Sequence, residues 1–489
     1  MVAFIPPKQA GKYKAVASGA ITNGKPVFVH TDGTVKQVVD NSISFSSGSN
    51  VTFETGNINF ETYSTGSTFD SSNNKVVLVY TDNSNSNYGT AVVGSISGST
   101  LSFGTPTVYE SAQTNYSKCT FDSDTNKVII AYSDEGNNGY GKAVVATVSG
   151  TTISFGSVAT FNNNGDTEHI GICYDSNASI VFISYRDNGA NGYGYIRLGE
   201  VSGTSISFGT NHLFNNNSTK STSPTFDSAN NKVVLSYSDT YDQKGRFNIC
   251  TVNNASSVTI GSLKTYESAT TDFVDSCFDS DQNKTVVVYE DTGNSEYGTI
   301  VVIDSSGNVS TPSVFNSAQT RDISCDFNSD TESGLIAFND GGNSNAITVK
   351  EFEVTNGSNS VSTRNKTTIN DRIGNKTRVV FDSNANKFVV SYRADHEDGP
   401  FAQANIVTSQ KTALTLTSEN YIGIASGGTY ADTAEATIDV VGTVNKDQTG
   451  LTAGQTYYVQ NDGTLGTSAD SPSVVAGTAI SATELIVKG

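Results

Sequence analysis

The chain of 489 residues carries a formal net charge of −19, contains no Trp and has only 8 Pro. An acidic surface disfavours nucleic acid and anionic membranes as partners, because both attract basic proteins. No apolar run approaches the roughly 18 residues of a membrane span, and the first residues lack the charged and apolar regions of a secretory signal. Short apolar runs between clusters of Gly, Asn, Asp and Ser predict an all-β fold.

The N-terminal part predicts an extended arm followed by a few short strands. Residues 1–13 contain two consecutive prolines and form the arm. Residues 14–40 are predicted to hold two or three strands, with a hairpin turn at 31–34. Asp-Gly lies in that turn, and Gly tolerates the positive φ angle that tight hairpin turns require.

A sequence repeat with a period of about 50 residues fills the middle of the chain. Each copy has an aromatic anchor, Asp or Asn, a polar turn, an apolar run and usually a second aromatic residue. The anchors are Phe69, Phe121, Tyr174, Phe226, Phe278, Phe327 and Phe381. The apolar run is continuous, as expected for a strand buried on both faces.

Each copy is predicted to contain four antiparallel strands, so residues 51–410 predict a seven-bladed β-propeller. An open solenoid of the same repeats is the alternative. The last copy lacks a fourth strand, whereas residues 51–63 match the fourth strand of the other copies. We therefore expect the segment 51–63 to complete the last blade and close the ring, which removes exposed sheet edges.

Residues 412–489 predict the second half of a small β-sandwich or barrel-like domain. The segment 451–464 aligns with 21–34, and a pair of strands follows each of them. Residues 14–45 and 412–489 are thus expected to form one split domain, with the propeller inserted into it. Insertions are tolerated where the ends of the inserted module lie close together.

The five cysteines are an odd number without close pairs, which argues against a disulfide framework. Four of them lie one or two residues before a repeat anchor: Cys119, Cys173, Cys277 and Cys325. We expect them to be small, buried, reduced core residues. A shared metal site is the alternative, and their neighbours do not favour it.

The turns between the second and third strands of the repeats are predicted to lie on the free face of the propeller. Each begins near an Asp, and four end in Tyr-Gly. Tyr and Asp in such a ring could stack on sugars and hydrogen-bond to them. The structural alternative is that Asp forms Asx turns and that Tyr packs against neighbouring blades. The candidate ligand-binding residues are Tyr88, Asp134, Tyr140, Asp187, Tyr193, Tyr241, Tyr297 and His396.

Signals for an enzyme or a metal centre are weak. None of the four histidines lies in a known catalytic motif. The acidic segment 393–399 offers possible ligands for a divalent ion, but its spacing fits no standard calcium loop. We therefore predict no catalytic residue, no cofactor and no metal. The alternative is a glycan hydrolase or lyase that uses carboxylates from different blades.

The segments 19–27, 421–425 and 450–459 resemble segments common in structural proteins of tailed bacteriophages. The repeated patterns Tyr-x-Asp-x-Gly-Asn-x-x-Tyr-Gly and Val-Ser-Gly-Thr-x-Ile-Ser-Phe-Gly are similar to those of phage fibre-like proteins. The resemblance implies a component of the virion surface, such as a head fibre, a capsid decoration or a tail adhesin. It implies contacts with other capsid or tail proteins, allows a homo-oligomer, and suggests attachment to host-surface glycans. It identifies no catalytic residue.

Overall fold

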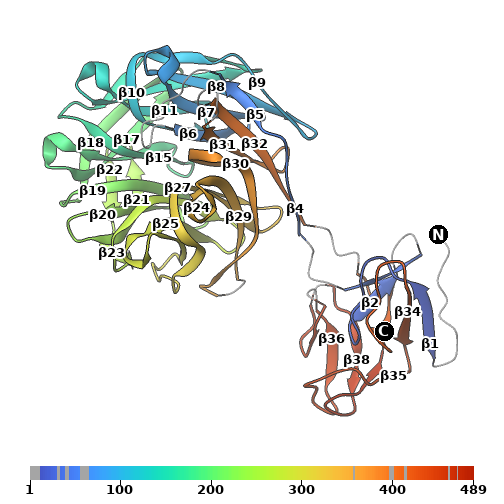
Figure 1. Cartoon of the computed structure of the whole chain (residues 1–489). Coiled ribbons are helices and arrows are strands. Elements are labelled where there is room, and N and C mark those ends of the chain that lie inside the picture. The colour runs from blue at the N-terminus through green and yellow to red at the C-terminus, as the bar shows by residue number, and fades with distance from the viewer. Residues whose placement is uncertain are drawn as a thin grey trace. The chain divides into compact units, whose positions relative to one another are not determined.

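The computed structural model describes residues 11–29, 33–38, 43–55, 65–355, 358–395, 401–411, 416–460, 463–470 and 472–488. These residues form β-strands and short 3-10 turns, without an α-helix, so the predicted all-β class is confirmed. Within them, no helix has the length and hydropathy needed to cross a membrane. The chain divides into a small unit, Met1–Ser44 with Gln410–Gly489, and a large unit, Phe45–Ser409 (Figure 1).

Each sequence repeat in the large unit supplies strands that pair antiparallel in chain order. The third repeat shows the pattern in full, in the order β15 (Thr167–Asp175), β16 (Ile180–Asp187), β17 (Tyr193–Ser202) and β18 (Ser205–Asn215). These are the first, second, third and outer strands of a repeat.

The other repeats follow the same order. Their first strands are β6 (Thr65–Asp70), β10 (Thr107–Asp122), β19 (Thr219–Asp227), β24 (Thr271–Asp279), β27 (Ser313–Asn328) and β30 (Val361–Asp382). Their second strands are β7 (Lys75–Asp82), β11 (Lys127–Asp134), β20 (Lys232–Asp239), β25 (Lys284–Asp291), β28 (Ser333–Asp340) and β31 (Lys387–Ala394). Their third strands are β8 (Tyr88–Ser97), β12 (Tyr140–Ser149), β21 (Lys244–Asn254), β26 (Tyr297–Ile303), β29 (Ala346–Val354) and β32 (Phe401–Lys411).

The outer strands are shorter or shared. They comprise β9 (Thr100–Phe103), β13 (Thr152–Phe155), β14 (Ala159–Asn162), β22 (Ser257–Ile260), β23 (Lys264–Glu267), and β4 (Ile43–Ser47) with β5 (Val51–Glu54). The long strands β10, β27 and β30 each begin as the outer strand of one repeat and continue as the first strand of the next. The sequence pattern predicted separate strands there.

The first strands contact one another in chain order, from β6 through to β30, and β30 in turn contacts β6. At the end of the series, β32 pairs with both β4 and β5. The sequence pattern placed the start of the array at residue 51, but strand pairing begins earlier, at Ile43. Residues 56–64 lie outside the described part of the chain. One hydrophobic cluster combines Val76 and Val92 of the first repeat with Val389 and Ala404 of the last.

The second strands form the centre of each sheet and are buried on both faces. In β11, for example, the residues Val128–Tyr132 have no exposed surface. In five repeats a tyrosine near the end of the second strand packs against an aromatic ring in the outer strand of the neighbouring repeat, as Tyr132 does against Tyr109, with ring centroids 5.1 Å apart. The apolar core of the large unit therefore lies between the repeats, because each of its clusters combines residues of two neighbouring repeats, as the one joining β7, β8, β10, β11 and β12 does.

The small unit contains two five-stranded sheets with the same topology. One has the order β1 (Lys12–Val16), β34 (Glu435–Val440), β33 (Tyr421–Ala425), β2 (Pro26–Val29) and β3 (Val35–Gln37). The other has the order β35 (Val444–Asn445), β39 (Leu485–Val487), β38 (Val475–Ala479), β36 (Thr456–Val459) and β37 (Leu465–Gly466). Gly423 and Gly477 lie in equivalent strands, and in each a Cβ atom would overlap a backbone carbonyl of the next strand. The internal repeat seen in the sequence thus corresponds to a repeated sheet.

Candidate functional site

Five of the aspartates that end second strands are followed by short 3-10 turns. These turns are η1 (Asn83–Asn85), η2 (Glu135–Asn137), η3 (Asn188–Ala190), η4 (Thr292–Asn294) and η5 (Gly341–Asn343). The carboxylates of Asp82, Asp187 and Asp340 accept a hydrogen bond from an N–H group of the turn, whereas those of Asp134 and Asp291 do not cap it. The Asp187 carboxylate accepts hydrogen bonds from the Gly189 N–H at 2.9 Å and from the Asn164 amide at 3.1 Å. Asp134 is buried at the equivalent position, and one of its carboxylate oxygens has no hydrogen-bond partner. Both carboxylates face the protein more than the solvent.

Four of the candidate tyrosines lie directly opposite these aspartates, across the hairpin. They are Tyr88, Tyr140, Tyr193 and Tyr297, and each is partly buried. Among the described residues, no ring contact joins any two of them, so the structure does not bring them together into one aromatic platform.

The glycine that follows each of these tyrosines makes room for the outer strand. A Cβ atom on Gly141 would lie closer than 3.0 Å to the ring of Phe161, and one on Gly298 would lie 2.5 Å from the ring of Phe315. Because real Cβ atoms do not approach so closely, the glycine of the Tyr-Gly motif is required for packing.

Tyr241 differs from the other candidates because its side chain is 77% exposed, the highest value for a large hydrophobic residue in the described part of the chain. It lies in the turn between β20 and β21, where its N–H donates to Asp239. A shallow groove begins at the next residue. It is lined by Asp242, Gln243, Ser268, Ala269, Thr270, Thr292 and Gly293.

This groove lies where two repeats meet. One wall is the turn after β20, the other is η4 of the next repeat, and the connection from β23 to β24 lies between them. The turns between second and third strands and the connections into the next repeat therefore share one face, as the topology predicted. A salt bridge of 2.5 Å from Arg246 to Asp242 braces the first wall.

The last candidate, His396, lies outside the described residues, as does most of the acidic segment around it. Among the described residues, no three His, Cys, Asp or Glu side chains gather closely enough to hold a metal ion. All five cysteines are buried and free, as predicted.

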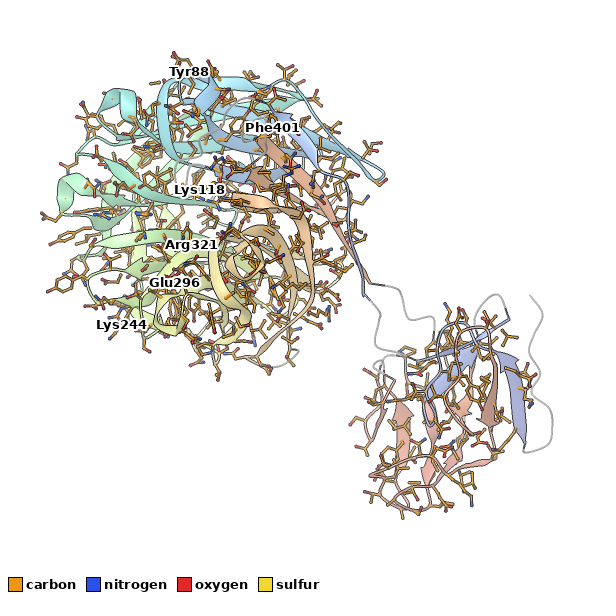
Figure 2. The ribbon with its side chains drawn as sticks, viewed as in Figure 1. Tyr88, Lys118, Lys244, Glu296, Arg321 and Phe401 are labelled. Atoms are coloured by element: carbon orange, nitrogen blue, oxygen red, sulfur yellow. The ribbon has the colours of Figure 1, made fainter. Side chains whose placement is uncertain are left out.

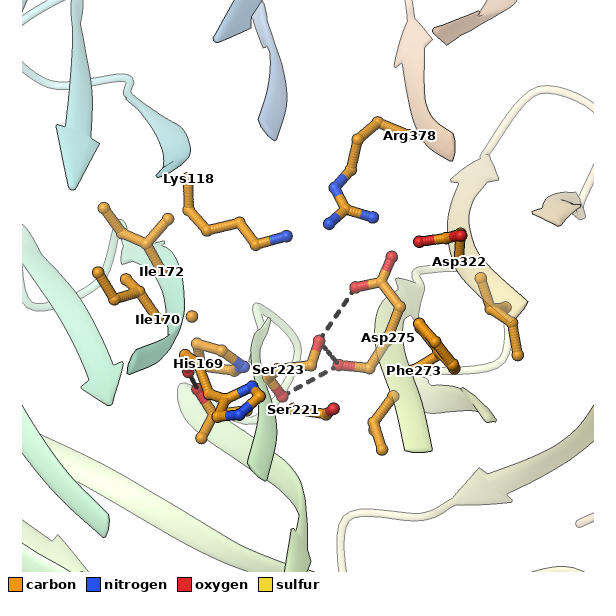
Figure 3. A pocket seen from close by; sticks show the side chains of 16 residues that line it. Lys118, His169, Ile170, Ile172, Ser221, Ser223, Phe273, Asp275, Asp322 and Arg378 are labelled. Atoms are coloured by element: carbon orange, nitrogen blue, oxygen red, sulfur yellow. Dashed lines mark hydrogen bonds between the residues drawn. The ribbon is translucent and has the colours of Figure 1, made fainter. Parts of the chain in front are cut away.

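A second site, which the sequence did not indicate, lies where the first strands meet. A cavity of about 140 Å³ is bounded by side chains from β10, β15, β19, β24, β27 and β30. We call it the axial cavity (Figure 3). A neighbouring cavity of about 340 Å³ shares Lys118, Asp275 and Arg378 with it. In Figure 2, Lys118 lies near the middle of the large unit, whereas Tyr88 and Lys244 lie at its periphery.

Each of the six first strands that line the axial cavity contains a β-bulge at the same place. The register shifts by one residue, and the bulged residue has a positive φ angle between 48° and 59° although it is not glycine. The bulged residues are Tyr116, His169, Ser221, Phe273, Asp322 and Lys376. This conformation costs about 1–2 kcal/mol for each residue that carries a Cβ atom. Bulges redirect side chains, and they occur often near functional sites.

Lys118 and Arg378 point into the axial cavity from the second and last repeats (Figure 3). Lys118 donates to the Thr65 carbonyl at 3.2 Å, and the Arg378 Nε donates to the same carbonyl at 2.8 Å. Burial lowers the pKa of Lys118 well below its usual value, and the charge of Arg378 lowers it further. Two cations thus face a small, partly open space in a protein that is acidic as a whole.

The remaining polar groups around the cavity are mostly paired. Asp322 forms a salt bridge of 3.2 Å with Lys376. Burial, followed by the charge of Lys220, lowers the pKa of His169 to about 3, so its ring is neutral at pH 7. Asp275 accepts from the Ser223 hydroxyl at 3.2 Å and from the Cys325 N–H at 3.1 Å.

A signal for this site was present in the repeat alignment. The position three residues before each anchor holds Gly or Ser in four repeats and a charged residue in the other three. In chain order it holds Gly66, Lys118, Gly171, Ser223, Asp275, Ser324 and Arg378. Its importance could not be recognised from the sequence, because nothing there shows that this position faces the cavity.

No protein-family model and no curated protein sequence matches the chain. Similar solved structures include a protein of unknown function from Dyadobacter fermentans, with a TM-score of 0.45 and 9% identity over 75% of this chain and 99% of that one. The SapL1 lectin in complex with alpha methyl fucoside has a TM-score of 0.41 and 11% identity, over 63% and 96% of the two chains. The WD40 domain of Toxoplasma gondii coronin has a TM-score of 0.45 and 9% identity, over 86% and 92%.

Proposed function

We propose that the large unit is a closed seven-bladed β-propeller inserted into a split small β domain. The cyclic order of contacts among the first strands supports closure, as does the hydrophobic cluster shared by the first and last repeats. The pairing of β32 with β4 and β5 supports insertion at a single place, because the chain enters and leaves the large unit through strands of the same sheet.

We propose further that the protein belongs to the surface of a tailed-phage virion. The small unit docks on other virion proteins, and the propeller binds host-surface glycans. The resemblance of the segments 19–27, 421–425 and 450–459 to phage structural proteins supports the virion role. The separation into two compact units, each with its own cores, supports a division between docking and recognition.

The observation that carries glycan binding is the exposed Tyr241 beside the groove. An exposed aromatic ring can stack on the apolar face of a sugar, while carboxylate, amide and hydroxyl groups receive its hydroxyls. Asp242, Gln243, Ser268 and Thr270 supply those groups in the groove. Tyr241 is therefore the candidate we favour among those found from the sequence.

Two of the carboxylates near the axis are in a state that disfavours catalysis. Asp272 pairs with Lys220, and Asp322 pairs with Lys376. A glycosidase needs two carboxyl groups that face one substrate, one as acid and one as base or nucleophile. Carboxylates held in ion pairs are poor candidates for both tasks.

A glycan array probed with the full chain tests this proposal. We expect the wild-type protein to bind a defined set of glycans and Tyr241→Ala to weaken that binding by roughly tenfold, because stacking and apolar burial are lost. Leu213→Ala is the control, since Leu213 is also exposed but lies in another repeat. Equal binding by Tyr241→Ala and the wild type, or no glycan bound by either, would contradict the proposal.

A further inference from the structure

The layer shared by the two cavities of the large unit contains charges that the fold alone does not require. Lys118, Asp275 and Arg378 occupy the same position in three repeats, and Gly or Ser occupies it in the other four. A small residue is therefore compatible with this architecture. The two cations line a partly open cavity whose walls also include Ser221, Ser223 and Phe273.

Among the described residues, and with Lys118 protonated, the charges in this layer sum to one positive charge. Lys118 and Arg378 contribute two positive charges and Asp275 one negative charge, while His169 is neutral and Asp322 is balanced by Lys376. No salt bridge within 4.0 Å involves Lys118 or Asp275 among the described residues. A single anionic group placed between the two cations would relieve their mutual repulsion.

We propose that Lys118 and Arg378, together with Asp275, Ser221 and Ser223, bind a hydroxylated monocarboxylate of the sugar-acid class in the axial cavity. A guanidinium and an ammonium group together hold a carboxylate well. The Asp275 carboxylate and the serine hydroxyls line the same cavity as the cations. The Ser221 hydroxyl donates to Asp272 and the Ser223 hydroxyl to Asp275, so both oxygens can still accept hydrogen bonds from ligand hydroxyls. The Phe273 ring supplies an apolar surface in the same cavity. This site is separate from the groove at Tyr241, so either one can fail without the other.

A competing explanation is that the two cations only fasten the ends of the ring, because both donate to the Thr65 carbonyl. The chain contains a more exposed lysine that serves as a control for that role. Lys387 of the last repeat donates to the Gly98 carbonyl of the first, so it also joins these repeats, but it does not line the axial cavity. If Lys118 had a purely structural role, substitution of either Lys118 or Lys387 should leave glucuronate binding unchanged.

The test is calorimetric titration of the full chain with sodium glucuronate, glucose and sodium acetate at constant ionic strength. We expect glucuronate to bind with one site per chain, acetate to bind more weakly and glucose not to bind. Lys118→Gln and Arg378→Gln should each weaken glucuronate binding at least tenfold, whereas Lys387→Gln should leave it unchanged. Wild-type affinity for glucuronate in both cavity variants, or glucose bound as tightly as glucuronate, would overturn the proposal.

A further variant keeps the test decisive if the cationic variants fold poorly. Asp275→Asn leaves both bonds to Thr65 in place and removes the negative charge beside the cations. It should tighten acetate binding several-fold and reduce the preference for glucuronate over acetate. The proposal fails if this variant leaves both affinities unchanged, or if inorganic phosphate binds the wild type as tightly as glucuronate does.

Proton uptake provides a readout that a structural role would not produce. Lys118 is faced by Arg378 on β30, Asp275 on β24 and His169 on β15, and burial together with Arg378 lowers its pKa. A bound carboxylate would raise that pKa, so ligand binding should take up protons. Titrations in two buffers with different ionisation enthalpies should then give different apparent enthalpies, and equal values would count against an anion at this site.

Discussion

At the scale of single residues, Glu290 makes the stability of the protein depend on pH. It is buried near Asp272, Glu296 and Arg321, and burial followed by the two negative charges raises its pKa from the ordinary 4.5 to about 8. Between these values the unfolded chain releases the proton while the folded protein retains it. The contribution of Glu290 to stability is therefore lost progressively as pH rises from about 5 to about 8.

Glu290→Gln should remove this dependence, because the amide has nearly the same shape and does not titrate. We expect the thermal midpoint of the variant to exceed that of the wild type by an amount that grows from pH 5 to pH 8. Burial raises the pKa of Asp279 to about 6, so Asp279 adds to the pH dependence of stability equally in the wild type and in the variant. The difference between the two melting curves therefore isolates Glu290, and a constant difference across this range would contradict the prediction.

At the scale of strands and turns, the glycine of each Tyr-Gly motif allows the outer strand to pack on the third strand. Gly141→Ala should push the Phe161 ring away from β12 and destabilise the protein by about 1–3 kcal/mol, the usual cost of overpacking. Gly48→Ala is the control, because its Cβ atom would meet only atoms at 3.5 Å or beyond. Chemical denaturation measures both. Equal stabilities of the two variants would show that the ring has room to move.

The elements show what the sequence can and cannot predict. The repeat period, the buried second strands and the Asp-containing turns follow from local patterns, so they are readable residue by residue. The joined strands β10, β27 and β30 are harder to predict from the sequence. Their continuity depends on pairing with the third strand of one repeat and with the second strand of the next. The bulges at residues such as His169 and Asp322 lie in segments that look like ordinary strands, and only the contacts between repeats reveal them.

The candidate site was predictable to a similar, limited extent. Tyr241 lies in a turn without the Tyr-Gly ending of four other repeats, and it is the most exposed of the candidates that the structure describes. Tyr140 and Asp187 were also candidates for ligand binding, but Tyr140 is partly buried and Asp187 is buried. Their repeated pattern reflects packing and turn formation. Lys118 and Arg378 were missed because residues far apart in the chain share the axial cavity only in the folded structure.

At the scale of the whole molecule, the proposed closure of the repeat array rests on contacts between its two ends. Phe53 of β5 completes the last repeat, and its ring lies 5.5 Å from that of Tyr80 and 5.1 Å from that of Phe103, both in the first repeat. Phe53→Ala should destabilise the protein by about 2 kcal/mol, less than a fully buried phenylalanine would, because its ring is partly exposed.

Hydrogen exchange shows whether the loss of stability caused by Phe53→Ala reaches both ends of the repeat array. In a closed ring, Phe53→Ala should accelerate amide exchange in β31 and β32 and also in β7 and β8. An open array would confine the change to β5 and its partner β32. The pattern of accelerated exchange therefore distinguishes a propeller from a solenoid.

The proposed function is tested most directly by immunogold electron microscopy of intact, purified phage particles, with antibodies against the large unit. The account predicts gold label at a fixed position on the outside of every intact particle, retained after washing in high salt. Antibodies that label no intact particle, with the protein recovered only from the soluble fraction of lysed host cells, would contradict a role on the virion surface.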